Sequence, residues 1–268
     1  MKIIRFNDAQ GCSHHGVMEP DGQVRVIVGD LFGAWTLADQ RAAPAKILAP
    51  VFPAAVFCIG LNYRRHAAET NARIPEYPVV FMKSPAAVQN PDDPVELPRH
   101  LASGQVDYEC ELAIIIGRKA KNVPAARALD YVLGFTAAND VSARDWQIQF
   151  GGSQWCRGKT FDTFCPIGPV LVTPDEIGNP NNLMIQTRVN GQTLQKSNTS
   201  DMIFSVEKII EFLSGSTTLL PGTVILTGTP EGVGMARQPP VWLKPGDQVE
   251  VEIDKIGILV NPVQDESC

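Results

Sequence analysis

The most informative segment of this chain is residues 106–117, Val106-Asp107-Tyr108-Glu109-Cys110-Glu111-Leu112-Ala113-Ile114-Ile115-Ile116-Gly117. Successive side chains of a β-strand point to opposite faces, which places Asp107, Glu109 and Glu111 together on one face. The other face is apolar and carries Tyr108, Cys110, Leu112, Ile114 and Ile116. We therefore predict a core strand over residues 106–116 with carboxylates on one of its faces.

Carboxylates on a core strand need an explanation, because burying them unpaired costs several kcal/mol. Either this half of the strand is exposed to solvent, or a cation compensates the charge. Ligands that offer only oxygen select a hard ion such as Mg²⁺, Mn²⁺ or Ca²⁺. Asp140 follows the apolar run 132–138 and is a candidate third ligand, although an Asp in this position also commonly caps a helix.

The rest of the chain predicts a β-rich α+β fold. Its 268 residues contain many short apolar segments, and the regular strand–helix alternation of a parallel α/β fold is missing. Turn residues and prolines separate a small N-terminal domain over residues 1–53, which contains β-strands, from a second domain over residues 54–268. We expect strands at 2–6, 24–28, 54–59, 79–83, 106–116, 131–138, 170–173, 184–189, 224–227, 249–253 and 256–260. We expect helices at 34–40, 62–71, 125–128 and 204–213.

Composition and charge narrow the class of protein. The formal net charge is −6, which disfavours nucleic acid or an anionic membrane as a partner, since either would require a basic face. No apolar run reaches the ~18 residues of a membrane span. The first residues read as the start of a strand, and no apolar signal-peptide core follows them. We expect a soluble, cytoplasmic protein.

Two further segments carry residues that could take part in catalysis. On a helix over residues 62–71, His66 and Glu69 are three positions apart and face the same side. A carboxylate that holds one imidazole nitrogen makes the other a better base, although a solvated helix with an incidental pair fits the same residues. Lys159 follows a glycine among aromatic residues. It is either a partly desolvated partner for an enolate or an ordinary surface lysine.

Five motifs together resemble the fumarylacetoacetate hydrolase (FAH) superfamily over residues 54–262. Segments 151–155 and 198–202 are most similar to its branch called FAH domain-containing protein 2, some members of which are linked to oxaloacetate keto–enol tautomerisation. The five motifs, which begin at residues 60, 109, 140, 158 and 227, are Gly-x-Asn-Tyr-x-x-His-x-x-Glu, Glu-x-Glu-Leu-Ala, Asp-Val-Ser-Ala-Arg-Asp-Trp-Gln, Gly-Lys-Thr-Phe-Asp-Thr-Phe and Thr-Gly-Thr-Pro-x-Gly-Val-Gly.

The resemblance implies a mixed β-sandwich roll that binds Mg²⁺, or alternatively Mn²⁺ or Ca²⁺, and forms a homodimer. It implies Glu109, Glu111 and Asp140 as metal ligands. It makes His66, held by Glu69, the base, and it places four residues against the substrate: Lys159, Arg144, Gln147 and Thr229. Asp107 and Lys83 carry over less securely.

The resemblance also implies a small anionic substrate, a 2-keto or β-dicarbonyl acid that reacts through a metal-bound enolate. The first interpretation is hydrolysis of a C–C bond in acylpyruvate-type substrates. Its alternatives are an oxaloacetate keto–enol tautomerase and an oxaloacetate decarboxylase, because all three reactions use the same enolate. The non-enzymatic alternative is a catalytically silent metal-binding assembly protein.

Overall fold

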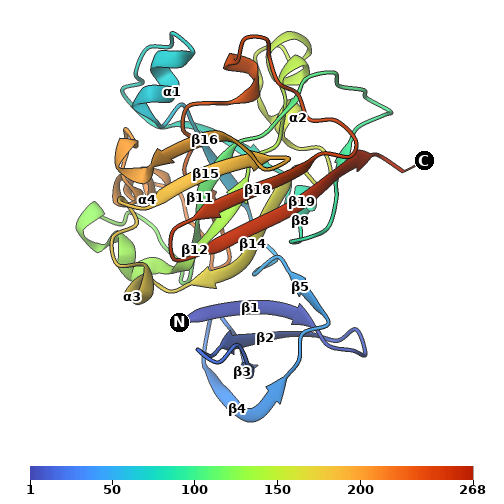
Figure 1. The fold of residues 1–268 in the computed structure, drawn as a ribbon. Helices are drawn as coiled ribbons and strands as arrows, with labels where there is room; N and C mark the ends of the chain where they lie inside the picture. The colour runs from blue at the N-terminus through green and yellow to red at the C-terminus, as the bar shows by residue number, and fades with distance from the viewer. Residues whose placement is uncertain (268) are drawn as a thin grey trace.

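The protein is described by a computed structural model over residues 1–267, and Cys268, which ends the predicted second domain, lies outside them. The predicted β-rich α+β roll is confirmed (Figure 1). Within residues 1–267, its largest sheet contains, in spatial order, β4 (Trp35–Ala42), β3 (Val24–Gly29), β2 (Ser13–Met18), β1 (Lys2–Asn7), β14 (Cys165–Val172), β12 (Val132–Asn139), β11 (Cys110–Ile116), β17 (Val224–Leu226), β6 (Val56–Gly60) and β7 (Val79–Lys83). Two short strands flank this order, β5 (Lys46–Leu48) beside β1 and β8 (Val88–Gln89) beside β14.

A second sheet packs against the middle of the first and makes the sandwich. Its strands, in spatial order, are β16 (Gln192–Asn198), β15 (Met184–Val189), β18 (Gln248–Ile253), β19 (Gly257–Asp265) and β9 (Val95–Leu97). In Figure 1, β18 and β19 cross in front of β12 and β14, and the two layers are in contact. The core between them includes Leu112, Ile114, Phe135, Ile185, Val251 and Leu259.

Helices are few and short, as expected. They are α1 (Arg64–Glu69), α2 (Cys156–Lys159), α3 (Pro174–Ile177) and α4 (Val206–Ser214). Single turns of 3₁₀-helix occur at Pro85–Ala87, Thr199–Asp201 and Gly234–Ala236, a longer one at Ala125–Tyr131, and a π-helical turn at Asp145–Phe150. The amphipathic helix predicted over residues 204–213 is α4, which buries Ile209, Ile210 and Leu213. No helix in the described part of the chain is long and apolar enough to cross a membrane.

The helix predicted over residues 34–40 is wrong, because this segment belongs to strand β4. It pairs antiparallel with β3, and Trp35 and Leu37 pack against a buried cluster on one side of the large sheet. Alternation of side chains across the strand therefore outweighs the helical propensity of the segment. Strand β2 was also missed: it lies between β1 and β3 and pairs with both.

The strand predicted over residues 106–116 is interrupted once. Val106–Asp107 forms the short strand β10, which pairs with β13 (Ser142–Ala143), and β11 begins at Cys110. From Cys110 onward the predicted alternation holds, since the even-numbered side chains enter the core between the sheets. Tyr108 departs from the pattern and joins a separate cluster. The interruption gives Asp107 surroundings different from those of Glu109 and Glu111.

The N-terminal strands lie at one end of the molecule (Figure 1). They continue the large sheet, because β1 pairs antiparallel with β14. The domain boundary predicted between residues 53 and 54 stays a prediction.

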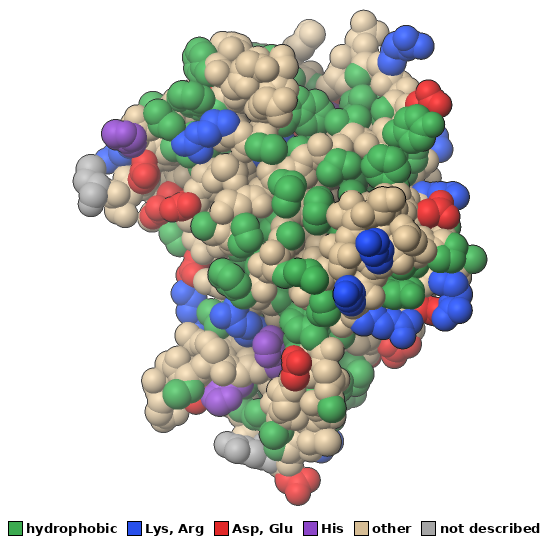
Figure 2. Space-filling model, turned by 180° about the vertical axis from the view of Figure 1, so that it is seen from behind, with side chains coloured by type: hydrophobic (Ala, Val, Ile, Leu, Met, Phe, Trp, Pro, Cys, Tyr) green, Lys and Arg blue, Asp and Glu red, His purple; other side chains and the backbone are tan. Residues whose placement is uncertain are grey.

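On the face seen in Figure 2, basic, acidic and hydrophobic side chains are interspersed.

Candidate active site

Three carboxylates predicted to lie together do meet in the structure. One oxygen from each of Glu109, Glu111 and Asp140 lies within 4.8 Å of the others. Pairing of β11 with β12 brings them together, because Cys110 faces Asn139 and the Asp140 N–H donates to the Glu109 carbonyl at 2.9 Å. The alternative of a solvent-exposed strand end is wrong, since the three residues are 4%, 1% and 0% exposed.

Two buried lysines contact this cluster. Lys159 Nζ donates to Glu109 Oε2 at 2.6 Å and to Asp140 Oδ2 at 2.7 Å. Lys83 pairs with the other oxygen of Asp140 and also donates to the Val141 carbonyl at 3.0 Å. Lys159 is 2% exposed, which excludes the surface-lysine interpretation. With both oxygens paired in this way, Asp140 is not a helix cap.

A glycine determines how closely the short helix of Lys159 approaches the site. A Cβ at Gly158 would overlap the Gln147 N and the Ala143 carbonyl, so only glycine lets α2 pack this tightly. The sequence places Lys159 directly after this contact. Its ammonium is thereby held among the carboxylates rather than in solvent.

Arg144 links the cluster to Asp107. Its guanidinium donates to Asp107 Oδ2 at 2.9 Å, to Glu109 Oε1 at 2.5 Å and to Gln147 Oε1 at 2.9 Å. Asp107 also accepts from the Gly234 N–H at 2.7 Å. Asp107 therefore anchors Arg144 and lies outside the group of three carboxylates, although the strand pattern placed it on their face.

His66 and Glu69 form the predicted pair on α1. His66 Nδ1 lies 2.8 Å from Glu69 Oε1, and the second Glu69 oxygen accepts from the Gly232 N–H at 2.9 Å. The His66 side chain is 10% exposed, which does not fit a solvated helix face. Asn62 attaches the start of this segment to the core, because its side-chain amide donates to the Thr227 carbonyl at 2.7 Å. Because the contact with Glu69 uses His66 Nδ1, the other ring nitrogen, Nε2, does not face Glu69.

The loop after β17 completes the site. Gly228 has a φ of +100°, a conformation that L-residues rarely adopt, and its N–H donates to Glu111 Oε2 at 2.6 Å. The next residue, Thr229, is 4% exposed. Its Oγ1 accepts a hydrogen bond at 2.8 Å from Gln195 on β16, a residue that the sequence analysis did not single out.

A small cavity of about 60 Å³ joins these side chains. Eight of the nine predicted site residues line it, and Glu69 stands behind His66. The wall residues that the sequence analysis missed are Ile59, Gly60, Leu61, Phe81 and Trp155. Trp155 ends segment 151–155, one of the two segments on which the resemblance to the FAH domain-containing protein 2 branch was based, and it packs edge-on against Phe81 with ring centroids 5.6 Å apart. The roles of the nine residues stay predictions.

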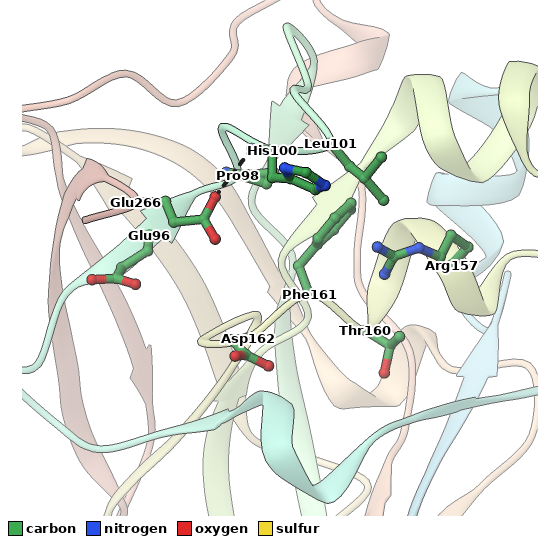
Figure 3. Close-up of a pocket in the computed structure, with 9 residues that line it drawn as sticks. All are labelled: Glu96, Pro98, His100, Leu101, Arg157, Thr160, Phe161, Asp162 and Glu266. Carbon is green, nitrogen blue, oxygen red and sulfur yellow. Dashed lines mark hydrogen bonds between the residues drawn. The ribbon is translucent and has the colours of Figure 1, made fainter. Parts of the chain in front are cut away.

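A larger cavity of about 260 Å³ is lined by Arg157 of α2 and by residues that directly follow this helix (Figure 3). Figure 3 shows Arg157 and Phe161 beside it, and the Arg157 guanidinium lies 4.2 Å from the centre of the Phe161 ring. Three carboxylates line it, those of Glu96, Asp162 and Glu266. None of the nine predicted site residues is in its lining, so this cavity is separate from the one at the carboxylate cluster.

The pKa values of Glu109 and Glu111 are shifted in opposite directions. Burial acts to raise the pKa of Glu109, but Arg144 and Lys159 lower it to well below the usual range. Burial and the charges of Asp140 and Glu109 raise the pKa of Glu111 well above its usual range. Among the described residues, the hydrogen-bond donor to Glu111 is the Gly228 N–H rather than a lysine or arginine. Glu111 therefore carries the least compensated charge of the three.

These residues fit a divalent metal. The donors are all carboxylate oxygens, which hard ions prefer, and they are close enough to share one ion. The site also favours a cation, because the hydrogen-bond donor to Glu111, the Gly228 N–H, carries no charge, and burial and the neighbouring carboxylates raise the pKa of Glu111. A buried carboxylate cluster that could hold a divalent ion is therefore present, and the identity of the ion is a separate question.

A family model described as "Fumarylacetoacetate (FAA) hydrolase C-terminal" matches residues 55–264. The chain belongs to the fumarylacetoacetate hydrolase family. A second model, "Rv2993c-like, N-terminal", matches residues 1–50. The family resemblance drawn from the five motifs is thus confirmed.

Relatives within the family are named as enzymes. The mitochondrial oxaloacetate tautomerase fahd2 of Xenopus laevis is 51% identical over 219 residues, which is 81% of this chain and 68% of that protein. The mitochondrial oxaloacetate tautomerase FAHD2A of Homo sapiens is 50% identical over 217 residues, with the same coverage of 81% and 68%. These matches confirm the predicted branch of the family and the interpretation as an enzyme.

Solved structures confirm the FAH fold. The fumarylacetoacetate hydrolase of Exiguobacterium antarcticum superimposes with a TM-score of 0.89 at 36% identity, covering 99% of this chain and 100% of that chain. The 5-carboxymethyl-2-hydroxymuconate delta-isomerase of Mycobacterium smegmatis gives a TM-score of 0.86 at 39% identity, with coverage of 99% and 100%. Family members on this fold therefore carry both hydrolase and isomerase names.

Proposed function

We propose that this protein is a divalent-metal-dependent oxaloacetate keto–enol tautomerase. The observation that carries the proposal is the combination of the buried carboxylate cluster with relatives about 50% identical that are named oxaloacetate tautomerases. This reverses the order of the sequence analysis, which put C–C bond hydrolysis first. The comparisons favour its alternative instead.

Glu109, Glu111 and Asp140 would hold the ion, for which Mg²⁺ is our first choice and Mn²⁺ or Ca²⁺ the alternatives. When bound, such an ion supplies Lewis-acid stabilisation of negative charge on substrate oxygen. The protein itself supplies cations beside the same carboxylates, Lys159 and Arg144. Burial makes their fields stronger than they would be in water.

His66 is suited to move the proton. Glu69 accepts from Nδ1–H and so leaves Nε2 with its lone pair directed away from Glu69. Nε2 would take a proton from C3 of the keto acid, the electron pair of the C–H bond would form the C2=C3 double bond, and the π pair of the 2-keto group would pass to its oxygen. Protonation of that oxygen then gives the enol, and the reverse sequence gives the keto form. No bond between carbon atoms breaks in either direction.

C–C bond hydrolysis is the second candidate. The fumarylacetoacetate hydrolase of Exiguobacterium antarcticum shares the fold, and a base such as His66 could activate water as well as remove a proton from carbon. Hydrolysis requires a water molecule beside the distal carbonyl. Tautomerisation requires none, so the fate of the substrate carbon–carbon bond distinguishes the two reactions.

A product assay with Mg²⁺ tests the proposal. The enol absorbance of oxaloacetate is followed while pyruvate is measured in the same sample, and protein treated with EDTA is the control. Accelerated loss of enol without pyruvate, abolished by EDTA and restored by Mg²⁺, supports the tautomerase. Pyruvate formed from oxaloacetate would instead show decarboxylation, and pyruvate plus a carboxylic acid formed from an acylpyruvate would show hydrolysis.

We also propose that the protein is a cytoplasmic homodimer. The resemblance supports the dimer, and Val80 and Met82, on the edge strand β7 of the large sheet, are 40% and 42% exposed. Light scattering coupled to size-exclusion chromatography tests the dimer, and a mass of one chain would contradict it.

A further inference from the structure

Gln195 is a buried amide between the two halves of the site. It lies on β16 and is 1% exposed. Its Oε1 accepts from the Cys110 N–H at 2.9 Å and from Thr187 Oγ1 at 2.7 Å. Its Nε2 donates to Thr229 Oγ1 at 2.8 Å and to the Pro230 carbonyl at 2.9 Å. One side chain therefore connects the strand of the metal-ligand candidates to the loop of Thr229.

The backbone determines which way this amide points. The Cys110 N–H is only a donor, so it must face the oxygen of Gln195. The Pro230 carbonyl is only an acceptor, so it must face the nitrogen. Exchanging the two ends would set donor against donor and acceptor against acceptor in a buried place, where hydrogen bonds left unmade are costly.

The orientation of the amide in turn determines the polarity of Thr229. Because Nε2 has only hydrogens to offer, Thr229 Oγ1 must be the acceptor of that bond. Its own hydroxyl proton then has to be donated elsewhere. Among the described residues no acceptor for that proton is recorded, and Thr229 lines the cavity.

We infer that Gln195 is a positioning residue that makes the Thr229 hydroxyl a hydrogen-bond donor to an anionic oxygen of the substrate. The identity of that substrate as a 2-keto acid rests on the proposed function. The inference about polarity rests only on the hydrogen bonds of Gln195. Gln195 acts through Thr229 and does not itself reach the cavity lining.

Oxalate is a suitable probe because it presents a carboxylate next to another anionic oxygen and undergoes no turnover. Its affinity is measured by titration calorimetry in saturating Mg²⁺. Thr229→Val, which removes the hydroxyl and keeps the shape, is expected to weaken oxalate binding by roughly tenfold or more, as for a hydrogen bond to a charged group. Thr229→Ser, which keeps the hydroxyl, is expected to bind nearly as well as wild type.

Two substitutions test Gln195 itself. Gln195→Glu keeps the shape and the acceptor oxygen but removes both N–H donors, which frees the Thr229 proton to turn toward the new carboxylate. Gln195→Met removes all four hydrogen bonds. Each is expected to weaken oxalate binding to a degree similar to Thr229→Val, and the double variant with Thr229→Val is expected to lose little more. Should one variant fail to fold in a thermal melt, the other provides the same comparison.

Thr187→Val is the matched control. It removes a bond to the opposite end of Gln195 without touching the cavity, so it is expected to lower stability and leave oxalate affinity unchanged. Full oxalate affinity in a folded Gln195 variant, or additive losses in the double variant, would overturn the inference. A protein that lacks tautomerase activity but shows this coupling would contradict only the proposed function.

Discussion

Glu111→Gln should make the metal-free protein more stable while abolishing its response to Mg²⁺. Glu111 is the carboxylate whose pKa burial and like charges raise, so its ionised form strains the metal-free site. The glutamine keeps an oxygen that can accept from the Gly228 N–H, and it removes the charge. The same change deletes one of three ligands from the carboxylate cluster.

The magnitude follows from the spacing of the charges. Two ionised carboxylates whose oxygens lie within 4.8 Å of each other repel by about 3.5 kcal/mol at that limit and an effective dielectric constant of about 20. Glu111 faces two such neighbours, and the attraction of Lys159 offsets part of the repulsion. We expect a net gain of about 2 kcal/mol, which corresponds to a rise in Tm of roughly 4–8 °C for a chain of this size.

Thermal melts with EDTA and with Mg²⁺ measure both effects. A ligand at about 100 times its Kd stabilises the native state by about 2.7 kcal/mol, so wild-type Tm should rise with Mg²⁺ while the variant's Tm stays constant. Glu111→Asp, which keeps the charge, is the control and should show no gain in EDTA. A variant that melts lower than wild type in EDTA and still responds fully to Mg²⁺ would refute the reasoning.

The pH dependence has a definite sign. A carboxyl group whose folded-state pKa lies above its unfolded value contributes stability that is present below the unfolded pKa and is lost as pH rises through the folded pKa. The metal-free wild type should therefore lose stability as pH rises through the raised pKa of Glu111. This contribution should be missing from Glu111→Gln in EDTA.

The other predictions concern catalysis and the cavity wall. His66→Ala should slow turnover by roughly 10²–10⁴-fold, the usual contribution of a general base, and should still bind Mg²⁺. Glu69→Gln should show a milder defect. An unchanged kcat in His66→Ala would mean that His66 takes no part in the reaction. Lys159→Met keeps the aliphatic stem, so kcat should fall by about 10²-fold with a smaller change in KM, whereas a rise in KM alone would mean that the lysine only binds substrate. Gly60→Ala places a Cβ into the ring of Trp155 and should cost about 1–3 kcal/mol in a denaturant titration, and a stability equal to wild type would show that the ring moves freely.

Local sequence patterns correctly predicted where a side chain lies when its position depends on a single strand or helix. The period-two alternation predicted which side chains of residues 110–116 share a face, and α4 appeared where apolar residues recur at helical spacing. The His66–Glu69 pair follows from three-residue spacing on a helix. The same kind of pattern failed for residues 34–40, because this segment pairs with β3 and its partly buried Trp35 and Leu37 pack against a distant cluster, neither of which local propensity reveals.

The sequence by itself determined which residues are candidates for metal binding, proton transfer and substrate contact, because the order and spacing of the motifs select them. Only the tertiary structure decided how their charges balance. Pairing of β11 with β12 puts Asp140 beside Glu109, and α2 brings Lys159 into the same buried space. Gln195 lies 85 residues from Cys110 and 34 from Thr229, yet it bonds to both. Strand periodicity says which face a side chain occupies, but the contacts across that face come from segments distant in the chain, and no local pattern encodes them.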